Sequence, residues 1–203
     1  MNFLAIDTSG KRLTVVACKN DKKYSSEICD CLHAHSVRLM EEIENVLHQA
    51  ELTPAECDFF CAVVGAGSFT GIRIGISTVK GLCLACGKPA LAVTSFDTLA
   101  YAERNGKTLA LVDAGRGFYY ACAYGEDGEE KISPRYLSTE EVTAIINEGY
   151  TPVSGEPLSL ATKQVNPAEG LFHAAAKKHK ETAPAQTLAA LYLRKSSAEE
   201  NAK

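Results

Sequence analysis

Residues 65–75 read Gly-Ala-Gly-Ser-Phe-Thr-Gly-Ile-Arg-Ile-Gly and decide the fold of this chain. A nearly continuous apolar run at residues 58–64 precedes them and predicts a strand buried on both faces. Residues 72–86 follow and predict a helix, which ends at the Gly-Lys-Pro of residues 87–89. A buried strand, a glycine-rich turn and a helix in this order indicate an α/β fold.

The glycine-rich turn leaves two interpretations open. Backbone N–H groups at the start of a helix can bind a phosphate, and the hydroxyls of Ser68 and Thr70 would add donors beside the charge of Arg73. Alternatively, the glycines only allow the helix and the strand to pack closely. The turn is not a Walker loop, because no Gly-Lys-Ser or Gly-Lys-Thr follows, and it is not a clean dinucleotide-binding pattern.

A strand pattern recurs in the two halves of the chain. Residues 4–7, Leu-Ala-Ile-Asp, are matched by residues 109–113, Leu-Ala-Leu-Val-Asp. Each apolar strand ends in an acid, a turn of small residues follows, and a second apolar strand begins, at residues 13–18 and 118–124. This repeat at about half the chain length predicts a duplicated fold.

The repeat predicts two lobes that divide near residues 104–107. The first lobe comprises residues 1–104 and carries the glycine-rich turn. The second, smaller lobe comprises residues 105–203, and we expect its last segment to pack back on the first lobe.

Two helices are expected to form a protein–protein surface. In residues 72–86 the only charged residues are Arg73 and Lys80, which share one face of the predicted helix. Every other side of this helix carries apolar or small residues. One face can pack on the sheet, and the rest needs a partner or the second lobe as cover. Together with a helix over residues 36–50, this predicts an interface that contains His35, Leu39, Ile43, Ile72, Arg73, Gly75, Ile76, Val79 and Lys80.

The bulk composition argues against direct nucleic-acid binding. The 203 residues have a net charge of −4, no Trp and 7% aromatic residues, whereas proteins that bind RNA alone usually show basic stripes or stacked aromatics. The one dense basic run, residues 177–180, is interpreted as a solvated helix end. The sequence has no signal peptide and no run of about eighteen apolar residues, so we expect a cytoplasmic protein without a membrane span.

The eight cysteines are expected to be reduced thiols. Residues 83–86 form a C-x-x-C and residues 29–31 a C-x-C, which could in principle hold a metal. Most of the cysteines lie in apolar runs, where a free thiol behaves as a small hydrophobic group. We therefore expect no metal or redox centre at these residues.

Four stretches, in order along the chain, resemble the bacterial TsaB (YeaZ) family. They are residues 6–9 (Ile-Asp-Thr-Ser), 65–75, 113–117 (Asp-Ala-Gly-Arg-Gly) and 191–194 (Leu-Tyr-Leu-Arg). The Ser-Phe-Thr-Gly-x-Arg-x-Gly core is highly specific. The chain departs from the family pattern at Ala66, where Pro is usual, and at Gly115, where Arg is common, and it is shorter than many members after Ser154.

The resemblance implies an α/β, actin-like (ASKHA, ribonuclease H-like) fold of two lobes. It also implies a non-catalytic subunit that pairs with the catalytic paralogue TsaD and the ATPase TsaE. That complex adds a threonylcarbamoyl group to adenosine 37 of tRNAs that read codons beginning with A. By the same resemblance the chain would form a homodimer when alone and meet tRNA only through the complex.

The resemblance also implies which sites are absent or incomplete. The paralogue's two metal-binding histidines correspond to Ser95 and Leu99 here, so no metal site is expected. His33 and His35 precede the glycine-rich turn. They are interpreted as a loop residue and as a helix-entry or interface contact. ATP or ADP with Mg²⁺ would bind only at a composite site closed by a partner. That site would include Asp7, Thr8, Ser9, Gly65, Gly67, Ser68, Phe69, Thr70 and Gly71.

Two other functions stay open at the level of sequence. Asp7 and Asp113 end strands where actin-like ATPases place magnesium-linked acids, so a free-standing kinase, or a metallopeptidase of this superfamily, is one alternative. Kinases of this class are about twice as long and carry a clear adenosine site in the second lobe. The other alternative is a homodimeric regulator unrelated to tRNA.

Overall fold

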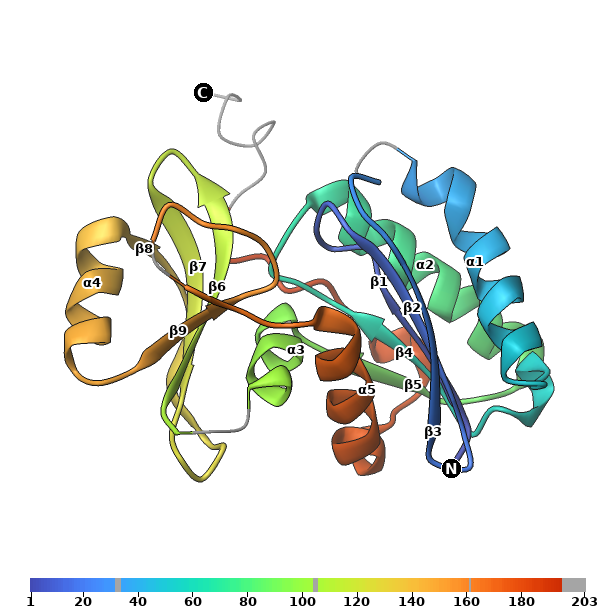
Figure 1. Ribbon diagram of the computed structural model, residues 1–203. Helices are drawn as coiled ribbons and strands as arrows, with labels where there is room; N and C mark the ends of the chain where they lie inside the picture. The colour runs from blue at the N-terminus through green and yellow to red at the C-terminus, as the bar shows by residue number, and fades with distance from the viewer. Residues whose placement is uncertain (32–33, 104–105, 161, 195–203) are drawn as a thin grey trace.

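The computed structural model describes residues 1–203 except 32–33, 104–105, 161 and 195–203. Two lobes lie side by side, each built around a five-stranded mixed sheet (Figure 1). The predicted α/β, actin-like architecture of two related lobes is confirmed. The expected lobe boundary falls partly on residues 104–105, which lie outside the described residues.

The first sheet has the strand order β3-β2-β1-β4-β5. Its first three strands form an antiparallel meander, and β4 and β5 then join parallel to β1. The strands are β1 (Phe3–Asp7), β2 (Leu13–Lys19), β3 (Lys22–Ile28), β4 (Phe59–Val63) and β5 (Ala90–Val93). Every residue of β4 is buried, as predicted for a strand covered on both faces.

The second sheet repeats this topology with the order β10-β9-β6-β7-β8. Three antiparallel strands come first, and two parallel strands are added beyond the first of them. The strands are β6 (Thr108–Gly115), β7 (Phe118–Tyr124), β8 (Glu130–Ser138), β9 (Thr151–Ser154) and β10 (Lys163–Gln164). The sequence analysis missed β8 and β10, because β8 is a largely exposed edge strand interrupted by Pro134 and β10 has only two residues.

Five α-helices occupy the described part of the chain. They are α1 (His35–Gln49), α2 (Phe69–Cys86), α3 (Ser95–Ala102), α4 (Thr139–Asn147) and α5 (Pro167–Lys178), with 3₁₀ turns at Pro54–Glu56, His179–Glu181 and Ala185–Thr187. Ser138 and Glu141 form a capping box at the start of α4, and Asn166 caps α5. Helix α2 begins three residues earlier than predicted, because the Ser68 hydroxyl accepts a hydrogen bond from Gly71 N at 3.3 Å and caps the helix there.

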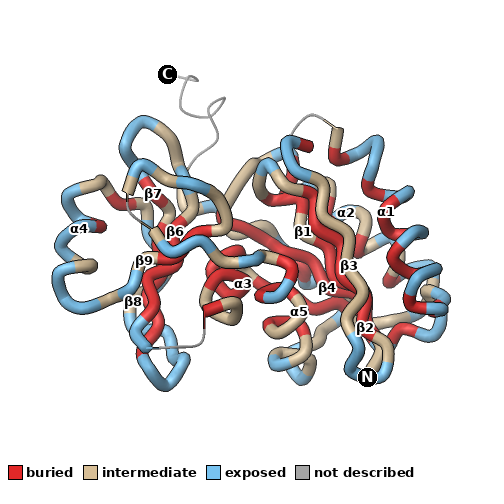
Figure 2. Tube along the Cα trace, in the orientation of Figure 1, coloured by how far each residue is buried: buried red, intermediate tan, exposed pale blue. Residues whose placement is uncertain are grey.

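The helices cover the two sheets unequally. Helices α1 and α2 lie on one face of the first sheet, with their sheet-facing sides buried and their outer sides exposed (Figures 1 and 2). Helix α3 follows the first sheet but packs Phe96 and Leu99 against the second sheet. Helix α5 follows the second sheet but packs Leu171 and Ala174 against the first. The lobes therefore exchange one helix each.

Asp97 holds the junction of the exchanged helices. Its carboxylate accepts the N–H of Thr94 at 2.8 Å and so caps α3. It also accepts Lys178 Nζ of α5 at 3.2 Å and the Tyr124 hydroxyl of β7 at 3.4 Å. One buried acid thus joins two helices and the second sheet, and the lobes are fixed to each other by more than the connecting chain.

Helix α2 is long and apolar enough to cross a membrane if only length and composition are considered. Its 18 residues have a mean hydropathy of 1.3, although they are not a continuous apolar run, because Arg73 and Lys80 lie among them. In the fold, however, Ile72 and Val79 are fully buried against the first sheet. Only 33% of the helix is buried in this way, and the rest of it, including Leu84, faces outward.

We predict that Gly170→Ala destabilises the fold by about 1–3 kcal/mol, the usual penalty for overpacking. A Cβ atom at this position of α5 would lie 1.6 Å from the Thr98 carbonyl oxygen of α3, so the helices would have to separate. Gly81→Ala is the matched control, because no described atom lies within 4 Å of a Cβ there and alanine favours the helix. Urea unfolding measures both; equal stabilities of the two variants would contradict the close helix contact.

Candidate functional site

The glycine-rich turn lies directly against the end of β1. The Thr8 hydroxyl donates to the Gly71 carbonyl at 2.7 Å, and Ser68 N donates to the Ser9 carbonyl at 2.7 Å. A Cβ atom on Gly67 would lie 2.3 Å from the Ser9 oxygen, and one on Gly71 would lie 2.0 Å from the Thr8 oxygen. These two glycines are therefore required by backbone contact inside the lobe.

The other side of the turn is covered by the C-terminal strap, which we define as residues 188–194. Leu191 N donates to the Val64 carbonyl at 2.8 Å, and a Cβ atom on Gly65 would lie 2.6 Å from the Leu191 oxygen. The ring of Phe69 stacks on Tyr192 with 4.3 Å between their centroids. Phe69, which was predicted to contact nucleotide, instead anchors the strap.

These contacts support the packing interpretation of the glycine-rich turn. The N–H groups of Ser68 and Gly71 bond within the protein, which removes two donors that a phosphate would have needed. Thr70 lies on the outer side of α2 rather than in the cleft between the lobes. The predicted residues are close together, but they do not form one open phosphate cradle.

A cleft of about 240 Å³ separates the turn from the second lobe. Of the nine predicted nucleotide contacts, four line this cleft: Asp7, Ser9, Gly67 and Ser68. Asp113 and Glu156 face them from the second lobe, and Lys11 and Arg12 add positive charge. The volume lies below the roughly 300–1,000 Å³ of ordinary small-molecule sites, so the cleft is small for a nucleotide.

Asp7 forms the base of a hydrogen-bonded chain in this cleft. Its Oδ1 accepts Ser9 N at 2.8 Å and the Ser9 hydroxyl at 2.6 Å. The Ser9 and Ser95 hydroxyls are 3.2 Å apart, and the Ser95 hydroxyl donates to the Ala66 carbonyl at 2.6 Å. Burial raises the pKa of Asp7 above its ordinary value, the two Ser9 bonds oppose this rise, and Glu156 adds a smaller repulsion.

Asp113 repeats the local geometry of Asp7 in the second lobe. Its Oδ1 accepts Gly115 N at 2.8 Å, just as Asp7 accepts the N–H two residues ahead. Asp113 is exposed, whereas Asp7 is largely covered. The duplicated strand ends therefore place matching acids in unequal surroundings on the two sides of the cleft.

Ser95 and Leu99 both line the cleft from α3. The sequence resemblance placed the paralogue's metal-binding histidines at these two positions. A leucine cannot bind a metal, and Ser95 is engaged with Ser9 and Ala66. Within residues 1–31, 34–103, 106–160 and 162–194, no three His, Cys, Asp or Glu side chains gather as metal ligands would.

The cysteines lie mainly in the cores. Six of the eight are buried, Cys86 is half-buried and Cys29 is exposed. Burial raises the pKa of Cys57 to about 12 and that of Cys83 to about 11, so these thiols stay protonated at neutral pH. Cys83 of the C-x-x-C therefore behaves as a packing residue.

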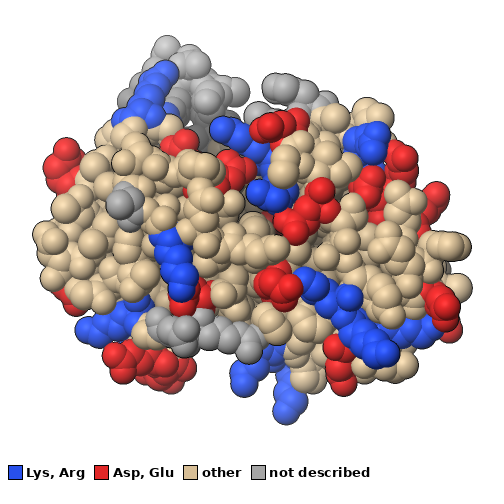
Figure 3. All heavy atoms as spheres, in the orientation of Figure 1, with Lys and Arg blue, Asp and Glu red and all other residues tan. Residues whose placement is uncertain are grey.

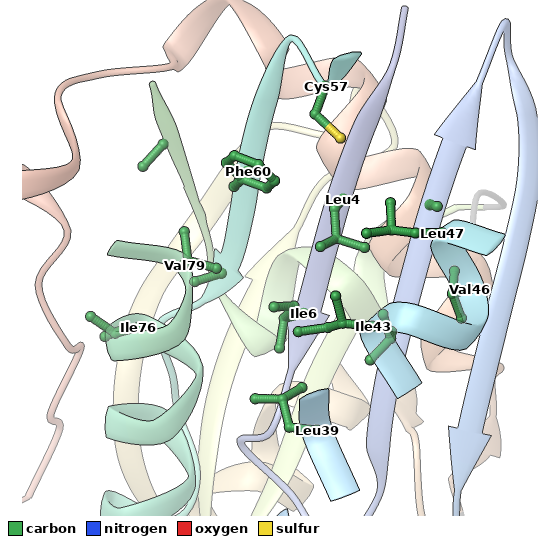
Figure 4. Packing of buried hydrophobic residues seen from close by; sticks show 14 of the residues in the cluster. Leu4, Ile6, Leu39, Ile43, Val46, Leu47, Cys57, Phe60, Ile76 and Val79 are labelled. Atoms are coloured by element: carbon green, nitrogen blue, oxygen red, sulfur yellow. The ribbon is translucent and has the colours of Figure 1, made fainter. Parts of the chain in front are cut away.

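The predicted partner surface requires correction, because most of its residues face the lobe's own sheet. Leu39 and Ile43 of α1 and Ile76 and Val79 of α2 point toward the strands (Figure 4). Gly75 also faces inward, since its Cβ would lie 2.7 Å from the Thr8 hydroxyl. The large aliphatic side chains of each helix fill the core, so the remaining face is the one that is open.

Two further members of the predicted surface are also internal. Ile72 is fully buried and His35 is only 2% exposed. Burial lowers the pKa of His35, and its Nε2 has no hydrogen-bond partner among the described residues. Arg73 is exposed and Lys80 is half-buried, so these two keep the predicted outward position. His33 lies outside the described residues.

The open face contains a groove that the sequence analysis did not identify. This α1–α2 groove has a volume of about 470 Å³ and is lined mainly by Ser36 and Met40 from α1 and by Thr70, Arg73, Ile74 and Ser77 from α2. Met40 is 50% exposed, and the neighbouring Val37 is 76% exposed. Exposed apolar side chains on one helix face indicate a docking surface. A helical wheel over residues 35–49 places Val37 opposite the core stripe, but it places Met40 on the same face as the buried Leu47, so periodicity alone does not show that Met40 is exposed.

We predict that Asp7→Asn stabilises the protein at pH 7. Because the folded-state pKa of Asp7 is raised, its ionisation opposes folding above that pKa, and this penalty disappears below the ordinary value of 3.8. The amide oxygen of the new side chain can still accept the Ser9 bonds, so the gain in free energy of unfolding should shrink as the pH falls toward 4. Urea unfolding at several pH values measures it. Asp113→Asn is the control, because that carboxylate is in solvent. A variant that is less stable than the parent at pH 7 would contradict the burial of Asp7.

Comparison with known proteins matches the chain to one family. The family model described as TsaD: tRNA N6-adenosine threonylcarbamoyltransferase matches residues 30–192. The tRNA threonylcarbamoyladenosine biosynthesis protein TsaB of Bacillus subtilis is 33% identical over 61% of this chain and 55% of its own length. The Escherichia coli protein of the same name is 29% identical over 80% of this chain and 71% of its own length.

The solved structures agree with the sequence comparison. The structure titled YeaZ from Pseudomonas aeruginosa is 25% identical and superposes with a TM-score of 0.78, covering 95% of this chain and 99% of that one. A second P. aeruginosa structure, described as similar to the peptidase YeaZ, gives a TM-score of 0.79 at 26% identity over the same coverage. The specific core at residues 65–75, the duplicated topology and these matches lead to one conclusion: the chain belongs to the TsaB (YeaZ) family.

Proposed function

We propose that this chain is a non-catalytic subunit of the complex that forms N6-threonylcarbamoyladenosine at position 37 of tRNAs reading codons that begin with A. It would bind and support a TsaD-type catalytic subunit, together with a TsaE-type ATPase, in the cytoplasm. The observation that carries this proposal is the family membership combined with a cleft in which Ser95 and Leu99 stand at the paralogue's metal-ligand positions.

The α1–α2 groove is the proposed site for the catalytic subunit. Its apolar part, with Met40 and Ile74, would be covered by apolar helix residues of the partner. Among the described residues that line the groove, Arg73 is the one cation, and it would supply a polar contact at the rim. The paralogue shares the fold, so a related helix pair can occupy the groove, and a second copy of this chain would use the same surface when the partner is absent.

Contact with tRNA is proposed to occur only through the complex. On the face shown in Figure 3, the acidic and basic side chains drawn in colour are interspersed and form no continuous basic stripe. The predicted basic run lies at the end of α5, where Lys178 pairs with Asp97 and with Glu181 at 3.6 Å. A charge already paired within the protein contributes little to binding phosphates.

A nucleotide is proposed to bind only at a site completed by the partner. The cleft offers Asp7, Ser68 and the nearby Arg12, but its volume of about 240 Å³ is small. The second lobe has no counterpart of the glycine-rich turn and α2, since described residues 155–160 and 162 join β9 to β10 without a helix. The same absence argues against a free-standing kinase, which needs a complete nucleotide site.

Met40→Glu should weaken binding to the TsaD-type protein of the same genome about tenfold or more, because a charge would be buried in an apolar contact. The fold should be unaffected, since Met40 is 50% exposed. Biolayer interferometry measures the affinity. Asn45→Glu adds the same charge to α1 outside the groove and is the control. Unchanged affinity of the Met40 variant, with the parent binding, would rule out this surface.

ATP or ADP should bind the lone chain with a dissociation constant of about several hundred micromolar or weaker, equivalent to no more than about −5 kcal/mol. Isothermal titration calorimetry on the lone chain and on the complex with the TsaD-type protein tests this. Tighter binding by the complex supports a composite site. Micromolar binding by the lone chain would show that the cleft is a complete nucleotide site.

A further inference from the structure

The C-terminal strap, residues 188–194, runs from the core of the first lobe to the surface of the second. Leu188 is 5% exposed and packs in the first-lobe core. Leu193 packs in the cluster between the lobes, which also contains Val112 of β6. The guanidinium of Arg194 lies over the ring of Tyr136 in β8, 5.6 Å from its centroid. The strap therefore contacts both lobes within seven residues.

Leu191 is a fixed point on the strap. Its N–H donates to the Val64 carbonyl at the end of the first sheet. A Cβ atom on Gly65 would lie only 2.6 Å from the Leu191 carbonyl oxygen, so the strap and the glycine-rich turn are in close contact. Leu191 also packs beside Leu193 in the cluster between the lobes.

Tyr192 connects the strap to the α1–α2 groove. Its hydroxyl accepts a hydrogen bond from Arg73 Nε at 2.9 Å, and the Arg73 guanidinium carbon lies 5.7 Å from the centre of its ring. The ring also stacks on Phe69 in the first turn of α2. Arg73 lines the groove, so the position of Tyr192 helps to set where this cation stands.

Only a short length of backbone joins the contact of Tyr192 with Arg73 to the contact of Arg194 with Tyr136. Tyr192 and Arg194 are two residues apart, and two residues of extended chain span at most about 7 Å. If the second lobe rotates, Tyr136 moves with it. Arg194 must then either lose its contact with the Tyr136 ring or pull the strap in the same direction. When the part of the strap that follows Leu191 shifts, Tyr192 moves. Arg73 then moves too, because it is hydrogen-bonded to the Tyr192 hydroxyl.

We infer that the C-terminal strap couples the relative position of the two lobes to the partner-binding groove through Tyr192 and Arg73. The inference rests on the proposed function, because it requires the α1–α2 groove to bind the catalytic subunit. Tyr192 is then a positioning residue for Arg73. Arg194 contacts Tyr136 in the second lobe, so its position depends on where that lobe lies. Because coupling between sites is reciprocal, binding of the partner at the groove also favours one arrangement of the lobes around the cleft.

A double-mutant cycle tests the coupling. The affinity for the TsaD-type protein is measured for the parent chain, Arg194→Ala, Tyr192→Phe and the double variant. Tyr192→Phe keeps the ring on Phe69 and removes only the hydroxyl that accepts from Arg73. Each single variant should weaken binding about two- to fivefold, the usual effect of one exposed cation–π contact or hydrogen bond. The double variant should be no weaker than Tyr192→Phe alone, because the route from Arg194 to the groove is already broken.

Two further variants separate coupling from general damage. Arg194→Lys retains a cation over Tyr136 and should restore most of the lost affinity. Lys107→Ala removes a comparable contact, to Tyr150 at 5.4 Å, on the second lobe away from the strap, and should leave the affinity unchanged. The coupling would be overturned if the affinity losses of the two single variants simply added in the double variant. It would also be overturned if Arg194→Ala had no effect, or if Lys107→Ala weakened binding as much as Arg194→Ala. If Met40→Glu also leaves binding intact, the groove is not the partner site, and the proposed docking surface fails separately from the coupling.

Discussion

The backbone contact between the glycine-rich turn and the end of β1 is the constraint on which the first lobe depends. Gly67 and Gly71 leave no room for a side chain beside the carbonyls of Ser9 and Thr8. The Thr8 hydroxyl and Ser68 N close the same contact with hydrogen bonds. Helix α2 starts at this point, and its direction across the sheet fixes which residues enter the core and which form the open groove. The contact also uses backbone donors that a phosphate would have required.

The duplicated fold explains why the cleft is built from similar parts but is incomplete. Asp7 and Asp113 end corresponding strands and accept the same local hydrogen bond. The described part of the second lobe lacks a glycine-rich turn of this kind, so the two walls of the cleft differ. The exchanged helices α3 and α5 and the Asp97 junction hold the walls together. The small cleft and the open α1–α2 groove are the structural features that support the proposed role beside a partner.

Much of the fold was accessible from the sequence, because strong local signals agreed with each other. The repeated strand and acid at residues 4–7 and 109–113 predicted two lobes, and the apolar run at residues 58–64 predicted the fully buried strand β4. Strand β8 was missed because an exposed edge needs few apolar residues. The partner surface was misassigned in α2 because apolar or small residues cover every side of this helix except the one with Arg73 and Lys80, so composition could not tell which of those sides meets the sheet. The strap contacts between Tyr192 and Arg73 join residues 119 positions apart, and no local pattern reveals them.

The central claim is that the chain is required for threonylcarbamoyladenosine formation but does not catalyse it. The direct measurement is mass-spectrometric detection of the modified nucleoside after reaction of unmodified tRNA with ATP, a threonylcarbamoyl donor and the purified subunits, with each subunit omitted in turn. We predict product with this chain and the TsaD-type and TsaE-type proteins together, and none with this chain alone or when it is left out. Product formed by this chain alone, or an undiminished yield without it, would contradict the account.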